Sequence, residues 1–127
     1  TLVDSMRNLT DDQIRAIGKN GGVIGINSVN VFNHKDKEKA SPTHMVDHVE
    51  HIAEIAGIEH VGIGFDICNS FSDYLQMEDA LPACDIITDH SHLEDFTAAL
   101  IERGYREKEI IGVLGGNFLR VYAQTID

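Results

Sequence analysis

The feature of this sequence that most constrains its fold is a pair of short apolar stretches containing glycine. Residues 61–65 alternate apolar side chains with glycine and lead directly to the carboxylate of Asp66. Residues 23–27 have the same character. Such runs are typical of short buried strands. Because Gly62 and Gly64 carry no side chain, they indicate that another part of the molecule approaches the backbone closely there.

A helical pattern lies between these two stretches. Ser41 and Pro42 are suited to the N-cap and the first position of a helix, and Gly57 is suited to its end. Because a helix that joins two apolar strands favours a parallel pair with a right-handed crossover, we predict that residues 22–27 and 60–66 are neighbouring parallel strands. The helix between them is expected to run from about Ser41 to Ala56.

About four helices are expected in all. Capping boxes predict two of the helix starts, and glycine pairs interrupt or end the patterns. We take the Gly-Gly pair inside the last helix to be a close contact with another element. The three further helices are residues 10–20 (capping box Thr10 and Gln13, ended by Gly21 and Gly22), 91–104 (capping box Ser91 and Glu94) and 107–123 (interrupted at Gly115 and Gly116).

Two strands cannot bury both of their faces, and an isolated two-stranded sheet is marginally stable at best. The chain has 127 residues, which suits one domain or a piece of one. The order of the elements therefore predicts an α/β fold in which residues 1–127 are the C-terminal portion of a larger barrel, carrying its last two strands.

Charge and hydropathy exclude several functions. The formal net charge is −11, from 21 acidic and 10 basic residues, and such a surface repels nucleic acid and anionic membranes. No apolar run has the length that a bilayer span needs. We therefore expect neither nucleic acid nor membrane to contact this segment.

Two charged residues are candidates for chemistry. Asp66 follows a predicted strand, where α/β barrels keep their catalytic groups, although a turn residue or helix cap is the alternative reading. Arg7 lies in the loop that enters the first helix, and an ordinary surface arginine is its alternative.

The histidines and cysteines indicate no complete metal site. His48 and His51 are three residues apart and share one helix face, and His90 and His92 fall at a helix start. We interpret His48 and His51 as structural and His90 and His92 as incidental to metal binding, and we expect no metal to be bound wholly by this chain. Cys68 and Cys84 form no metal-binding pair, and they are expected to be ordinary thiols, as in a reducing compartment.

Several segments together resemble the membrane (renal-type) dipeptidase family of zinc peptidases, in order and over nearly the whole chain. They are Arg7-Asn8 before a helix, His48-Val49-Glu50-His51-Ile52, the run from Ala56 to Asp66 and Gly115-Gly116-Asn117-Phe118-Leu119-Arg120-Val121. The resemblance implies a (β/α)8 TIM-like barrel of the metal-dependent hydrolase kind, which binds two zinc ions and cleaves dipeptides.

The resemblance also implies residue roles. Asp66 matches a catalytic aspartate that contacts the substrate amino group, and Arg7 matches the arginine that binds the substrate carboxylate. Both roles suit the chemistry, because a guanidinium fork fits a carboxylate and an aspartate beside a metal-bound water can pass on its proton. We expect both side chains at the C-terminal end of the strands, facing one cavity.

Two departures from the family pattern leave alternatives open. Cys68 stands where the family usually has a second aspartate, and the family's metal ligands all lie upstream of Arg7. The chain is thus either a segment of an active zinc dipeptidase or a metal-free fragment or pseudo-enzyme that binds without catalysis. The expected partners are a dipeptide and the remainder of the barrel, a homodimer is compatible with them, and the expected setting is the bacterial cytoplasm.

Overall fold

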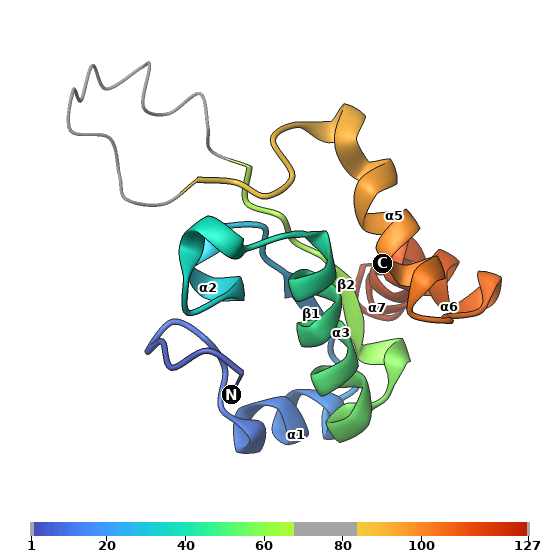
Figure 1. Cartoon of the computed structure of the whole chain (residues 1–127). Helices are drawn as coiled ribbons and strands as arrows, with labels where there is room; N and C mark the ends of the chain where they lie inside the picture. The colour runs from blue at the N-terminus through green and yellow to red at the C-terminus, as the bar shows by residue number, and fades with distance from the viewer. Residues whose placement is uncertain (1, 68–83, 127) are drawn as a thin grey trace.

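The computed structural model describes residues 2–67 and 84–126, and its centre is a parallel two-stranded sheet (Figure 1). Strand β1 (Ile24–Ile26) pairs with β2 (Val61–Ile63) in the register Ile24 to Val61. The parallel pair that the sequence predicts is confirmed, although both strands are shorter than expected. Backbone pairing continues past the strands, because the amide of Ser28 donates to the carbonyl of Phe65 at 2.9 Å.

Helix α3 (Pro42–Ala56) joins the strands as predicted and packs against them (Figure 1). It lies between α1 (Asp11–Lys19) and α5 (Leu93–Glu102), and both of these helices contact it. The predicted capping box of α1 is present. Helix α3 ends at Gly57, whose φ of 106° suits glycine, and the 3₁₀ turn η2 (Ile58–His60) then leads into β2.

The apolar faces of these helices and strands meet in one core. Its most deeply buried side chains come from the inner face of α3, from β2, from the segment before α5 and from α5 itself. They include Met45, Val46, Val49, Val61, Ile87, Phe96 and Leu100. The rings of Phe65 and Phe96 meet edge to face, with centroids 5.3 Å apart, and this contact joins the segment after β2 to α5.

The segment that follows β1 contains more helical structure than its composition indicates. The sequence predicts a charged loop over residues 31–40, whereas the structure has helix α2 (Asn30–Asn33) and the 3₁₀ turn η1 (Lys37–Lys39). An antiparallel bridge joins Val29 to Asp85. The chain that returns towards α5 thereby packs beside the carboxyl end of β1.

The last predicted helix is present in three parts, which are α6 (Glu107–Ile111), the π-helical η4 (Gly112–Gly116) and α7 (Asn117–Thr125). The predicted close contact at Gly115 and Gly116 is wrong. A Cβ at Gly115 would meet nothing within 4 Å, and one at Gly116 would meet only the backbone of Ile111. These glycines lie where the helix kinks.

The expected close approach to the strand glycines is confirmed. A Cβ at Gly62 would lie 2.4 Å from the ring of Phe118 in α7, and a Cβ at Gly64 would lie 3.0 Å from Cα of Gly25 on β1. Only glycine at position 62 leaves room for that ring, so α7 can pack directly against β2.

The start of α5 also differs from its prediction. The 3₁₀ turn η3 (His90–His92) precedes the helix, and the side chain of Asp89 accepts from the amide of Ser91. The predicted capping box of Ser91 and Glu94 is therefore wrong, because Asp89 caps the preceding turn. Within residues 2–67 and 84–126, no helix has the length and apolar character needed to cross a membrane.

Candidate active site

Asp66 lies just beyond the C-terminal end of β2, and its carboxylate is exposed. Its φ of 57° places it in the left-handed region, the only non-glycine residue there among those that the structure describes. This conformation is uncommon for residues with a Cβ and recurs at functional sites. The strand tip thus carries a carboxylate on a backbone conformation that glycine, asparagine and aspartate adopt more readily than other residues.

Asn27 lies beyond the end of β1 and holds this carboxylate. Its Nδ2 donates to Oδ2 of Asp66 at 3.3 Å. Its own Oδ1 accepts from the amide of Val29 at 2.7 Å, and its carbonyl accepts from Nδ2 of Asn33 at 2.9 Å. The sequence analysis did not identify Asn27. Its signal is an amide side chain directly after a glycine-containing strand that runs parallel to the strand of Asp66.

A buried serine fixes the two strand tips relative to each other. Ser28 is completely buried, and both its amide and its hydroxyl donate to the carbonyl of Phe65 at 2.9 Å. Its Oγ also lies 3.4 Å from a carboxylate oxygen of Asp85. Because Ser28 and Phe65 adjoin Asn27 and Asp66, this clamp fixes the backbone on which the polar pair stands. Ser28 too was missed from the sequence.

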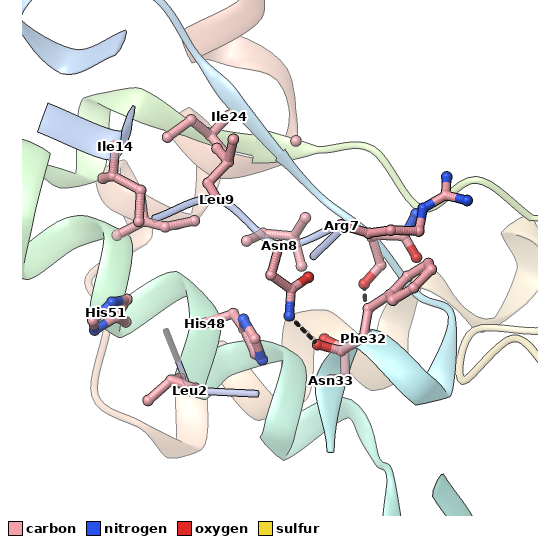
Figure 2. A pocket seen from close by; sticks show the side chains of 14 residues that line it. Leu2, Arg7, Asn8, Leu9, Ile14, Ile24, Phe32, Asn33, His48 and His51 are labelled. Atoms are coloured by element: carbon pink, nitrogen blue, oxygen red, sulfur yellow. Dashed lines mark hydrogen bonds between the residues drawn. The ribbon is translucent and has the colours of Figure 1, made fainter. Parts of the chain in front are cut away.

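Arg7 lies in the loop before α1, and its guanidinium is over the ring of Phe32 in α2, with Cζ 5.2 Å from the ring centroid (Figure 2). Asn8 anchors this loop, because its Nδ2 donates to the carbonyl of Phe32 at 2.9 Å. Arg7 is therefore held against the helix that follows the C-terminal end of β1. It is exposed, and the guanidinium retains its hydrogen-bonding capacity for an anion.

Arg7 and Asp66 lie at the same end of the sheet but line different cavities. Arg7 and Asn27 line a cavity of about 190 Å³ beside β1 (Figure 2), whereas Asp66 lines one of about 240 Å³ together with Phe65 and His90. The expectation that both side chains face one cavity stays a prediction for the complete barrel. Asn27 connects the two regions, since it lines the first cavity and binds Asp66.

His48 and His51 both line the cavity of Arg7, and their surroundings differ (Figure 2). Nε2 of His51 lies 2.9 Å from a carboxylate oxygen of Asp11, and this hydrogen bond lowers the pKa of Asp11. Burial lowers the pKa of His48, which a backbone hydrogen bond with Asn33 partly opposes. Nε2 of His48 is buried, and no described residue is its hydrogen-bond partner. The hydrogen bond of His51 thus agrees with a structural role for this histidine, whereas a structural role does not explain the buried Nε2 of His48.

A metal centre does not fit the described part of the chain. Within residues 2–67 and 84–126, no group of three or more histidine, cysteine, aspartate or glutamate side chains could hold a metal ion. His92 lies near the acidic side chains of Asp89 and Asp95, whereas His90 is part of the cavity of Asp66. Cys68, the expected departure from the family pattern, lies outside the described residues.

The opposite end of the sheet carries the Gly-Gly-Asn-Phe-Leu-Arg segment. Nδ2 of Asn117 donates to the carbonyls of Ile58 and Val61 at 2.9 and 2.7 Å. The guanidinium of Arg120 donates to the carbonyls of Gly21 and Glu59, both at 3.0 Å. This motif therefore fixes the entry to β2 and faces away from the candidate site.

A parallel strand–helix–strand unit with a carboxylate at a strand tip is what part of a TIM-like α/β barrel, the fold of a large class of hydrolases, contains. Two solved structures confirm this class. The chain has a TM-score of 0.73 to the metallopeptidase dipeptidase AC of family M19, at 26% identity over 94% of this chain and 33% of that one. A metallopeptidase from Rhodobacter sphaeroides, bound to a phosphinate mimic of the dipeptide L-Ala-D-Ala, gives 0.76 at 26% identity over 98% of this chain and 33% of that one.

The chain belongs to the membrane dipeptidase family, peptidase family M19, whose family model matches residues 1–127. It is 32% identical to dipeptidase ataJ of Aspergillus terreus, covering 100% of this chain and 29% of the relative. It is 33% identical to an uncharacterised dipeptidase of Schizosaccharomyces pombe, covering 98% of this chain and 28% of the relative. The chain thus spans less than a third of the length of these relatives.

Proposed function

We propose that this chain is the C-terminal part of a metal-dependent dipeptidase and supplies two of its substrate-binding groups, Arg7 and Asp66. The observation that supports this most is the position of Asp66, an exposed carboxylate in the left-handed conformation at the tip of β2. The match of the chain to a dipeptidase family over residues 1–127 supports peptide-bond hydrolysis as the reaction in which that carboxylate takes part.

The two residues suit the two ends of a dipeptide. The fork of the Arg7 guanidinium can bind the terminal carboxylate through paired charge-assisted hydrogen bonds. Asp66 can bind the terminal ammonium, and in the hydrolysis its carboxylate accepts and returns a proton. Since these two groups bind the charged termini of the substrate, the substrate class is a short peptide whose amino and carboxyl termini are both free.

The metal ions belong to the part of the protein outside this chain. The described residues contain no set of ligands for them, so we assign no residue of this chain to metal binding. The proposed cofactor is zinc, in two sites formed by the remainder of the barrel.

The open edges of the sheet support the remainder of the barrel as a partner. Only β1 and β2 pair in the described sheet, so each has an edge that further strands can complete. Large apolar side chains are also exposed, among them Leu2, Met6, Ile111 and Leu119, which is expected of a surface that other elements cover. We further propose a cytoplasmic setting and a homodimer for the complete enzyme.

The test uses the complete protein, purified and supplied with zinc. We expect it to hydrolyse L-Ala-L-Ala or L-Ala-D-Ala to free alanine, and we expect a chelator to abolish the activity. Dipeptides with an acetylated amino terminus or an amidated carboxyl terminus should react at least about 10-fold more slowly, because each loses one charge-assisted contact. Binding of dipeptides without hydrolysis in the presence of zinc would instead favour the metal-free binding module.

A further inference from the structure

We infer that Asn27 is a positioning residue for catalysis, which acts by orienting the carboxylate of Asp66 at the tip of the neighbouring strand. The inference rests on the proposed function of Asp66. It adds a residue that sequence reasoning did not identify and that touches Asp66 rather than the substrate.

The amide of Asn27 can take only one orientation. Its Oδ1 lies 2.7 Å from the amide nitrogen of Val29, which can only donate, so this atom must be the acceptor. The other terminal atom is therefore the NH₂ group, and it faces Oδ2 of Asp66 at 3.3 Å. The backbone of Val29 thus ensures that Asn27 presents a donor to the carboxylate.

The backbone beneath Asn27 is rigid as well. Asn33 is buried, and its Nδ2 donates to the carbonyls of Asn27 and Val29, both at 2.9 Å. The completely buried Ser28 ties the next residue to Phe65. Asn27 therefore stands on a fixed platform formed by β1 and α2, whereas Asp66 is exposed.

The pair gives an exposed carboxylate one preferred direction. Asp66 could otherwise rotate freely in solvent, and a reacting group that is about 1 Å out of place can cost about 100-fold in rate. The donor binds Oδ2 and leaves Oδ1 for the substrate ammonium and for proton transfer. Because the amide is neutral, it orients the carboxylate without neutralising its charge.

The experiment compares three variants of the complete enzyme. Asn27→Asp keeps the acceptor for Val29 but removes the donor to Asp66. Asn27→Ser is a second variant, since its hydroxyl can reach the amide of Val29 but is too short for Asp66. Asn20→Asp is the matched control, because it adds the same charge at the C-cap of α1, at the other end of the sheet. We expect both Asn27 variants to lower kcat about 10- to 100-fold, with a smaller rise in KM because the ammonium contact of Asp66 is also disturbed, and with an unchanged Tm, whereas the control retains full kcat and KM.

A double-mutant cycle separates positioning from a structural role. If Asn27 acts through Asp66, then Asn27→Asp costs nothing further in the Asp66→Asn background. A second loss of the same size there would contradict the inference, as would full activity of both Asn27 variants while Asp66→Asn is inactive. Full activity of Asp66→Asn itself would instead overturn the proposed role of Asp66, so the two failures are distinguishable.

Discussion

The two ends of the small sheet differ in what their polar side chains hold. At the N-terminal end, Asn117 and Arg120 each donate to two backbone carbonyls, and Nδ1 of His60 lies 2.7 Å from the carbonyl of Gly22. At the C-terminal end, the amide of Asn27 donates to a carboxylate that remains exposed. Polar groups thus satisfy the backbone at the N-terminal end. At the C-terminal end Ser28 and Asn33 also bind carbonyls, but Asn27 in addition holds an exposed carboxylate, to which we assign a part in the reaction.

This difference assigns the two ends to stability and to chemistry. Buried amides bound to carbonyls cost free energy when removed, because the carbonyls are left unsatisfied. A carboxylate in solvent adds little to stability, since exposed polar contacts are weak. Substitution of the carbonyl-binding Asn117 should therefore lower the free energy of unfolding, whereas substitution of the exposed Asp66 should lower the rate.

The largest expected effect is that of Asp66→Asn in the complete enzyme. We expect kcat to fall about 1,000-fold, within the range that a positioned acid–base group contributes, while Tm and zinc content stay unchanged. Steady-state kinetics with a dipeptide and metal analysis measure both. A loss below 10-fold, or a parallel loss of zinc, would place Asp66 outside the chemistry.

The next effect is at the opposite end of the sheet. Asn117→Ala removes the donor to the carbonyls of Ile58 and Val61, so the free energy of unfolding should fall by about 2–3 kcal/mol with little change in the kcat of the folded enzyme. Urea unfolding measures this, with the exposed Gln124 of the same helix as the control position. An unchanged midpoint would show that this amide is dispensable.

Arg7→Ala should mainly raise KM, by about 10- to 100-fold, because a charge-assisted hydrogen bond contributes about 1.5–3 kcal/mol and binds ground and transition states alike. The variant should also lose the preference for a free carboxylate over an amidated dipeptide. Arg15→Ala is the control, since this exposed arginine pairs with Asp12 on α1. Retained discrimination in Arg7→Ala would assign carboxylate binding to another residue.

The smallest expected effect concerns pH and His48. Burial lowers the pKa of His48 in the folded state, whereas the unfolded value is about 6.5. Above pH 6.5 the histidine is neutral in both states. As the pH falls below that value, the unfolded state takes up the proton before the folded state does, so stability decreases. His48→Gln should reduce the fall in Tm between pH 7 and pH 5, and an identical fall in both proteins would exclude this cause.

Local patterns account for the elements that the sequence predicted correctly. The capping box of α1, Pro42 at the start of α3 and Gly57 at its end are signals that act within one helix turn, and the glycine-containing strands are recognisable from their own residues. Asp66 and Arg7 could be proposed as site residues because Asp66 follows a predicted strand and both match a motif of the family. Asp66 lies at this end of the sheet because it follows β2, and Arg7 lies there because it stacks on Phe32 of α2, the helix that follows β1.

The interactions that sequence reasoning missed join distant residues or depend on competition between neighbours. Asn27 and Asp66 are 39 positions apart, and Ser28 and Asp85 are 57 apart, so no short window contains either pair. Ser91 and Glu94 have the spacing of a capping box, but the amide of Ser91 donates to the side chain of Asp89 instead. Such outcomes depend on the folded backbone, which periodicity alone does not specify.

The most direct test of this account is a crystal structure of the complete enzyme with a phosphinate dipeptide mimic. The account predicts that the mimic's ammonium lies within about 3 Å of Oδ1 of Asp66, with Oδ2 still bound to Asn27, and that its carboxylate lies equally close to the guanidinium of Arg7. A mimic whose two termini bind elsewhere, with Arg7 still on Phe32 and Asp66 facing solvent, would contradict it.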